Sequence, residues 1–169
     1  MKIALLHLDV AEGPETRNGR TIISAAGEAV SRGADWIVTP ETALQGYFFY
    51  DSNGKLPSFS EKQLSRYLFF AGRNKADMVL VTAAWPPGKC CSDPVSVWET
   101  CSKLCGVPVI VCNQTGYHER MDMREAESAV IVEGQRLFTY KGDPAVLFCE
   151  WDEGKMRIRS RAFEVVHVK

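Results

Sequence analysis

A pattern that occurs three times along the chain places the strongest limits on its fold. Each time, an amphipathic helical segment ends at a Gly or Asn breaker, and a continuous apolar run follows. A short apolar run without alternation is typical of a strand buried on both faces of a sheet. Helices that alternate with such strands predict an α/β fold.

The expected elements follow from this pattern. Strands are expected over residues 3–10, 35–41, 78–83 and 107–112. Helices are expected to begin at about residue 16, at Ser60 and at Pro94, with Asp93 as a cap. The inward face of the first helix is expected to carry Ile22, Ile23, Ala26 and Val30. Trp98, Cys101 and Cys105 are expected to point inward from the last helix, which Gly106 ends.

The last third of the chain changes character. Residues 128–132 and 136–140 flank a Gly-containing turn and predict a β-hairpin, and a further strand is expected over residues 145–151. No linker or low-complexity segment divides the sequence. We therefore expect a single domain over residues 1–169.

Composition and charge exclude several classes of protein. The 20 Lys and Arg residues nearly balance the 21 Asp and Glu residues, and no basic cluster stands out, so nucleic acid is not an expected partner. No apolar run is long enough to cross a bilayer, and we expect a cytoplasmic protein without a membrane partner. The 6 cysteines have no disulfide-scaffold spacing, so we expect reduced thiols. Cys101 and Cys105 stand one helical turn apart, which would suit two metal ligands, but no second pair accompanies them and we expect no metal site.

Glu41 is the first candidate for chemistry. It directly follows Pro40, which ends an apolar strand. Open α/β sheets place their ligand groups at the carboxyl ends of strands. A half-buried carboxylate there has a raised affinity for protons and can act as a general base near neutral pH.

Four segments of the chain resemble the nitrilase superfamily, the carbon–nitrogen hydrolases. Residues 32–47 are similar to the family's first catalytic motif, and residues 76–86 to the strand after its nucleophile segment. Residues 106–116 are similar to its next strand, which ends in an Asn-x-Thr-Gly turn, and the hairpin around residues 133–135 fits its late strands. The resemblance implies a nitrilase-like α-β-β-α sandwich, reduced in its middle part.

The resemblance also implies a mechanism. In that family a Cys thiolate attacks an amide or nitrile carbon, a Glu moves protons, and a Lys stabilises the developing negative charge, without a cofactor. Glu41 matches the Glu of this triad. A nucleophilic thiolate beside a base and a fixed cation is a sound arrangement for acyl transfer.

The lysine and the cysteine carry over less cleanly, because the chain is short between Tyr47 and Asp77. If the segment from residue 60 is the helix after the nucleophile, the nucleophile falls near Leu56, where no Cys stands. If residues 55–57 are instead the Lys-to-Leu-Pro stretch of some members, Lys55 is the lysine and the cysteine strand is absent. Cys90 and Cys91 follow a loop that in the family lies beside the pocket, and Cys91 is the candidate for a relocated nucleophile.

Tyr47, Trp85 and Asn113 are the candidates for substrate binding. Tyr47 and Trp85 are aromatics at strand ends, where pocket and core positions are equally expected. Asn113 follows an apolar strand, and its amide can bind either a ligand or the backbone of its own turn. By resemblance the substrate is a small amide or nitrile, and members of the family usually assemble into homo-oligomers.

Two functions remain open from the sequence. One is a hydrolase of non-peptide carbon–nitrogen bonds, impaired because no Cys occupies the family's nucleophile position. The other is a non-catalytic nitrilase-like domain that acts through oligomerisation or ligand binding, since lost central elements leave apolar edges that need a partner. An internally truncated product with no function of its own is a third alternative.

Overall fold

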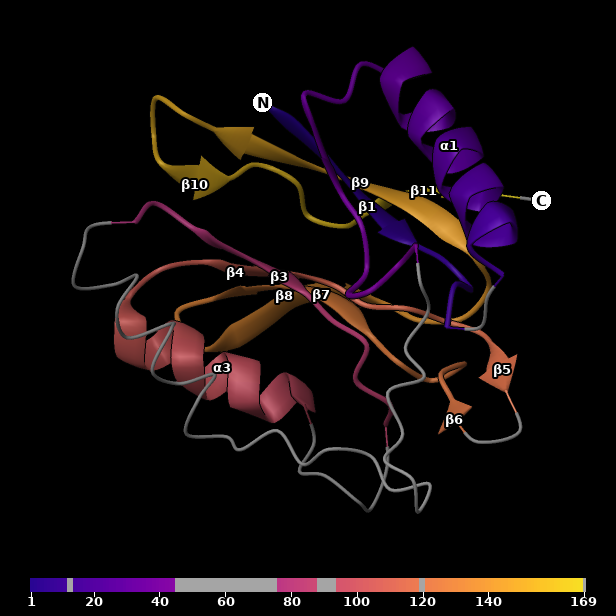
Figure 1. Ribbon diagram of the computed structural model, residues 1–169. Helices are drawn as coiled ribbons and strands as arrows, with labels where there is room; N and C mark the ends of the chain where they lie inside the picture. The colour runs from indigo at the N-terminus through magenta and orange to yellow at the C-terminus, as the bar shows by residue number, and fades with distance from the viewer. Residues whose placement is uncertain (12–13, 45–75, 88–93, 119–120, 169) are drawn as a thin grey trace.

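The computed structural model describes residues 1–11, 14–44, 76–87, 94–118 and 121–168, and the statements below concern these residues. The helix expected from Ser60 and the cap expected at Asp93 lie outside them. Two sheets face each other, with one helix on the outer side of each (Figure 1).

The first sheet brings together the two ends of the chain. Its path runs β10 (Arg157–Ile158), β9 (Ala145–Asp152), β1 (Lys2–His7) and β2 (Trp36–Val38), and β11 (Glu164–His167) also pairs with β9. β1 and β2 are parallel, with Ala4 opposite Ile37. β1 is shorter than the strand expected over residues 3–10, because it starts one residue earlier, at Lys2, and ends at His7.

The second sheet contains the other two apolar runs and the hairpin. Its order is β3 (Val79–Thr82), β4 (Val109–Cys112), β7 (Ser128–Val132) and β8 (Gln135–Tyr140). β3 and β4 are parallel, and β7 and β8 form the expected antiparallel hairpin. A small pair, β5 (Tyr117–His118) and β6 (Met121–Asp122), lies beyond β4.

Three apolar clusters hold the four layers together. α1 (Glu15–Ser31) packs through Ala25 and Ala29 onto the first sheet, and α3 (Pro94–Cys105) packs through Trp98 and Cys101 onto the second. The third cluster lies between the sheets and joins Leu5 and Leu147 of one sheet to Ile110 and Val130 of the other. The fold is therefore the expected α-β-β-α sandwich, and its inter-sheet core is the main source of hydrophobic stabilisation.

The predicted inward face of α1 is partly wrong. Ile23 and Val30 are 73% and 63% exposed, whereas Asn18, Ala25 and Ala29 are buried and Ile22 and Ala26 are half-buried. Asn18, Ile22, Ala25 and Ala29 recur at helical spacing and define the true stripe, and Ile23 lies about 100° away from Ile22 around the axis. Small alanines let the helix backbone approach the sheet, which large apolar residues at these positions would prevent.

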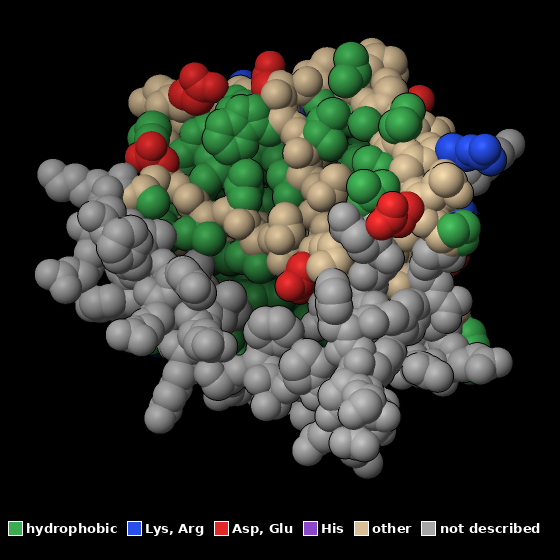
Figure 2. Space-filling model, viewed as in Figure 1, with side chains coloured by type: hydrophobic (Ala, Val, Ile, Leu, Met, Phe, Trp, Pro, Cys, Tyr) green, Lys and Arg blue, Asp and Glu red, His purple; other side chains and the backbone are tan. Residues whose placement is uncertain are grey.

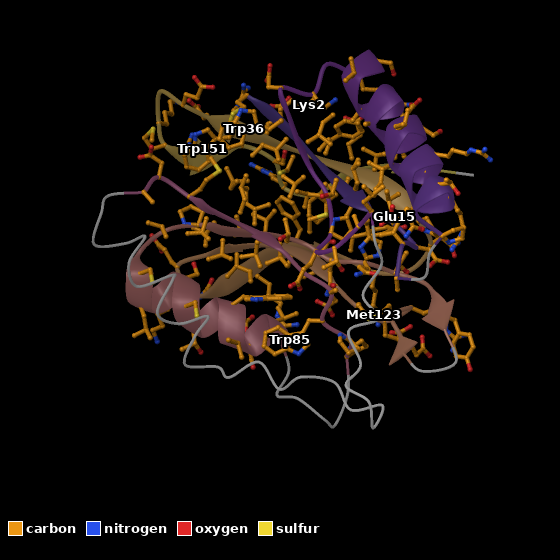
Figure 3. All side chains as sticks on the ribbon, viewed as in Figure 1. Lys2, Glu15, Trp36, Trp85, Met123 and Trp151 are labelled. Carbon is orange, nitrogen blue, oxygen red and sulfur yellow. The ribbon has the colours of Figure 1, made fainter. Side chains whose placement is uncertain are left out.

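β2 also differs from its prediction as a buried strand. Trp36 and Ile37 are 48% and 37% exposed, while Val38 is buried. β2 is an edge strand of the first sheet, so neighbouring elements cover its side chains less than those of a central strand. Figure 2 shows hydrophobic side chains gathered in the upper left of the viewed face, where Figure 3 labels Trp36 and Trp151.

Candidate functional site

The carboxyl ends of four strands meet at one end of the sandwich. The Thr115 N–H, after β4, donates to Leu8 O after β1 (3.1 Å), and the Glu41 N–H, after β2, donates to Ala83 O after β3 (3.4 Å). Gln114 Nε2 donates to the carbonyl of Glu41 (3.3 Å). These bonds tie the two sheets together, and they place Glu41 at the end where α/β folds bind ligands.

The turn after β4 needs its glycine. Gly116 has φ 104°, and a Cβ there would overlap the Asp9 carboxylate. Glycine is favoured because it adopts this positive φ without strain, and because any Cβ would force the Asp9 side chain to move. The Asn-x-Thr-Gly sequence noted above is therefore the segment that brings the ends of β1 and β4 together.

Backbone strain lies next to Glu41. Thr42 has φ 49°, in the left-handed region that β-branched residues rarely adopt. Such a conformation costs on the order of 1–3 kcal/mol, and it persists only when the surrounding structure imposes it. The backbone N–H and the carbonyl of Glu41 are both hydrogen-bonded, to Ala83 and to Gln114, and these two bonds supply that constraint.

The environment of the Glu41 carboxyl favours its protonated form. The residue is half-buried, and burial raises the pKa of the carboxyl above its ordinary value of 4.5. A hydrogen bond from the Ala84 backbone N–H opposes part of this shift by stabilising the carboxylate. A carboxyl with a raised pKa suits a group that accepts a proton and returns it near neutral pH.

Glu41 also lines an open hollow of about 590 Å³. Its lining also includes Gly19, Ile22 and Ile23 of α1, together with Leu44 and Thr82. This volume is in the range of small-molecule sites, which are mainly apolar with few polar groups. The exposed face of α1 thus borders the candidate site.

Asn113 is fully buried and bonded to the backbone. Its Oδ1 accepts hydrogen bonds from the N–H groups of Trp85 (3.1 Å) and Gln114 (3.0 Å), and its Nδ2 donates to Trp85 O (3.1 Å). Its own N–H donates to Ser128 Oγ (2.9 Å), which also bonds His7 Nδ1 (2.9 Å). The side chain therefore holds the loop after β3 against the end of β4.

Trp85 lies between the sheet end and α3. Its ring makes an edge-to-face contact with Trp98, with 6.0 Å between centroids, and it packs on the α3 cluster (Figure 3). Such a contact fixes the ring orientation. The structure thus brings Trp85 and Asn113 into direct contact and places the neighbours of both, Ala84 and Gln114, against Glu41.

Sequence reasoning missed Gln114 as a positioning residue. It is buried directly after Asn113, and its amide reaches the Glu41 backbone. Its signal in the sequence is its place immediately after an apolar strand, next to a polar residue already singled out. Tyr47, Lys55, Cys90 and Cys91 lie outside the described residues.

The described cysteines are poor nucleophiles. Cys112 Sγ donates to the carbonyls of Val38 (3.3 Å) and Leu6 (3.5 Å), and its complete burial raises the pKa of the thiol. Burial raises the pKa of Cys149 to about 12, and it also raises the pKa of Cys101 and Cys105 on α3. Because the thiolate is the reactive form, none of these four thiols is activated.

Metal-binding clusters and membrane-spanning helices are absent from the part of the chain that the structure describes. The described ranges contain no group of three His, Cys, Asp or Glu side chains that could hold a metal ion. No helix within them is long and apolar enough to span a bilayer.

The pH dependence of stability gives a first test of the Glu41 environment. Because the folded-state pKa is raised, the folded protein binds this proton more tightly than the unfolded chain. The stabilising contribution is therefore complete below the ordinary pKa of 4.5 and is lost as pH rises through the folded pKa. The melting temperature of Glu41→Gln minus that of the wild type should increase over this window in differential scanning fluorimetry; a constant difference would contradict the raised pKa.

Comparison with known proteins supports the fold assignment. No family model and no curated protein matches the sequence. Among solved structures, the amidase NitN from Nesterenkonia sp. AN1 matches with a TM-score of 0.74 at 15% identity, over 92% of this chain and 94% of that chain. Nit3 from Saccharomyces cerevisiae, a member of branch 10 of the nitrilase superfamily, matches with a TM-score of 0.75 at 10% identity, over 92% and 91%.

A third structure extends the comparison. Glutamine-dependent NAD+ synthetase from Acinetobacter baumannii matches over 99% of this chain and 48% of that chain, with a TM-score of 0.74 at 14% identity. At these identities the likeness establishes the fold alone. The chain has the nitrilase-like fold that the sequence segments predicted.

Proposed function

We propose, from the nitrilase-like fold and the environment of Glu41, that this protein hydrolyses the carbon–nitrogen bond of small amides with low turnover. In this proposal residues 1–169 act as a single domain. The observation that carries the proposal is the half-buried Glu41 carboxyl with a raised pKa at the border of a small-molecule-sized hollow. Structures of the Nesterenkonia amidase support the substrate class, because one contains butyramide and another carries the acetamide moiety of fluoroacetamide on the active-site cysteine.

The proposed chemistry divides the work among three residues. Glu41 takes the thiol proton of Cys91, and the thiolate attacks the amide carbon. Lys55 stabilises the negative charge on the amide oxygen. The proton returns to the leaving nitrogen, ammonia departs, and water then cleaves the thioester to give the carboxylic acid and restore the thiol. Tyr47 is proposed as a wall of the substrate site, with Trp85.

Low turnover follows from the placement of the nucleophile. The thiols of Cys101, Cys105, Cys112 and Cys149 have raised pKa values, which leaves Cys90 and Cys91. We take Cys91 as the nucleophile, and its position differs from the family's. Activation of a thiol needs a nearby base and cation in the correct geometry. A nucleophile introduced from another loop is expected to meet that need less well than one on the family's own strand.

The nucleophile is tested by substitution with a matched control. Ammonia release from acetamide, butyramide and the corresponding nitriles is measured for the wild type, Cys91→Ser and Cys105→Ser. We expect Cys91→Ser to eliminate activity on the amides, and Cys105→Ser, on the outer helix α3, to retain it. Amide hydrolysis that survives in Cys91→Ser would show that another group is the nucleophile.

A second candidate function is association without catalysis. The exposed Trp36 and Ile37 on β2 favour it, because large apolar side chains at a sheet edge promote pairing with a further surface. In this case a second copy of the chain is the partner.

Sedimentation velocity separates the two candidates. If association is the function, the wild type sediments as a homo-oligomer and Trp36→Lys shifts it to monomer, while the exposed but isolated change Leu104→Lys on α3 has no effect. An inert wild-type monomer at all concentrations would rule out this candidate.

A further inference from the structure

The β9–β10 hairpin forms a second hollow at the other edge of the sandwich. Its volume is about 670 Å³, and it is lined by four basic side chains: Lys155, Arg157, Arg159 and Arg161. Leu137 of β8 and Ile158 of β10 contribute apolar side chains to the lining. β10 and β8 lie at the opposite ends of their sheets from β2 and β3, so this hollow shares no residue with the one at Glu41.

Strand geometry explains how the cations come to one side. Side chains alternate between the two faces of an extended segment. Ile158 pairs opposite Trp151 and packs against the core between the sheets, which leaves Arg157 and Arg159 on the other face. The segment continues along β9, because the Arg159 N–H donates to Glu150 O (2.9 Å) and Ser160 Oγ accepts the Glu150 N–H (2.9 Å).

The positive charge of this hollow is largely unbalanced. Arg159 Nη1 lies 3.7 Å from Glu150 Oε2, and Asp152 is the acidic residue in the lining. The side chains of Lys155, Arg157 and Arg161 form no ion pair with any residue that the structure describes. The expectation that no basic cluster stands out is therefore wrong: four cations stand within residues 155–161, and the fold places all four around one hollow.

We propose that this hollow binds a small ligand that carries two or more linked phosphate groups. Guanidinium groups match phosphate oxygens in a bidentate geometry, and three of the four cations are arginines. The volume fits a small molecule. The four cations are confined to one seven-residue segment beside the anionic Asp152, which suits a compact polyanion better than an extended nucleic acid, whose binding needs a longer basic surface.

Inorganic pyrophosphate is the probe for this site. Its binding is measured by isothermal titration calorimetry at low ionic strength for the full chain, for Arg157→Gln/Arg161→Gln, and for Arg20→Gln/Lys103→Gln. The last pair removes the same charge from the exposed surfaces of α1 and α3. We expect saturable binding by the wild type, a Kd raised about tenfold or more by the first pair, and a Kd within about twofold for the control pair.

Further probes identify the source of the phosphates and the outcomes that overturn the proposal. A nucleoside triphosphate that binds more tightly than inorganic triphosphate would identify a nucleotide, and equal binding would identify the phosphate chain alone; both support the site. Absence of saturable pyrophosphate binding overturns it, as does equal weakening by both variant pairs. An oligonucleotide that binds more tightly than pyrophosphate, and only when Arg157 and Arg161 are present, would replace the small ligand by nucleic acid.

Discussion

Replacing Glu41 by glutamine is expected to reduce ammonia release from small amides by about 10²- to 10⁴-fold, the usual contribution of a general acid–base group. The amide side chain keeps the size of the carboxyl and can still meet the Ala84 N–H through its oxygen, but it cannot accept the thiol proton. The loss should appear in kcat, because the proton transfer belongs to the chemical step. Steady-state ammonia assays measure it.

The matched control is Glu153→Gln, which removes the same charge from an exposed carboxylate on the β9–β10 hairpin. Its activity should equal that of the wild type. Activity of the wild type should also rise with pH through the raised pKa of Glu41, since only the carboxylate accepts a proton. Full activity in a folded Glu41→Gln protein would show that this carboxyl takes no part in the reaction.

Asn113→Ala is expected to destabilise the protein by about 3 kcal/mol, the largest effect on stability among these predictions. The substitution removes three hydrogen bonds made by one fully buried amide. It leaves the N–H and carbonyl of Trp85 and the N–H of Gln114 without that partner. Urea denaturation of the full chain measures the change in the free energy of unfolding.

An exposed amide provides the comparison for this variant. Gln135→Ala on β8 removes a side chain of the same chemical class from the surface and should change stability by no more than about 0.5 kcal/mol. An Asn113→Ala protein of unchanged stability but raised KM would assign Asn113 to substrate binding. Loss of stability with little change in KM assigns it to positioning the Trp85 loop.

Much of the fold could be predicted because burial leaves a periodic signal. The apolar segment at Val109–Cys112 lies at the centre of its sheet and is buried along its whole length. Gly106 ends α3 with φ 68°, as its position predicted. The inner face of α1 could not be read from large apolar residues, because Ala25 and Ala29 make the contact and Ile23 and Val30 do not.

The candidate site could be predicted only where a chemically reactive side chain stands at a position, such as the end of a strand, that the sequence itself reveals. Glu41 combines a titratable group with the end of a strand, and the structure gives it a half-buried, proton-retaining environment. The role of Asn113 depends on its hydrogen bonds to Trp85, a residue 28 positions away in the sequence, so a local pattern could not assign it. Lys55, Cys91 and Tyr47 stay predictions.

The basic hollow could not be recognised from composition. The four cations between Lys155 and Arg161 alternate with other residues, and the net charge of the whole chain is −1. All four cations stand within residues 155–161, so a local window of the sequence contains the cluster and only the whole-chain balance hides it. The pairing of β10 with β9 then fixes where this segment lies in the fold.

Covalent labelling with iodoacetate, which has no amide bond to hydrolyse, tests the central claim most directly. A thiolate that displaces iodide forms a carbon–sulfur bond and adds one carboxymethyl group, which peptide mass spectrometry locates on a single cysteine. We expect one carboxymethyl group per folded chain, on Cys91, at a rate that falls in Glu41→Gln. Labelling at Cys105 instead, or a rate at Cys91 that is the same in wild type and Glu41→Gln, would contradict the proposal that Glu41 activates a cysteine for attack on amides.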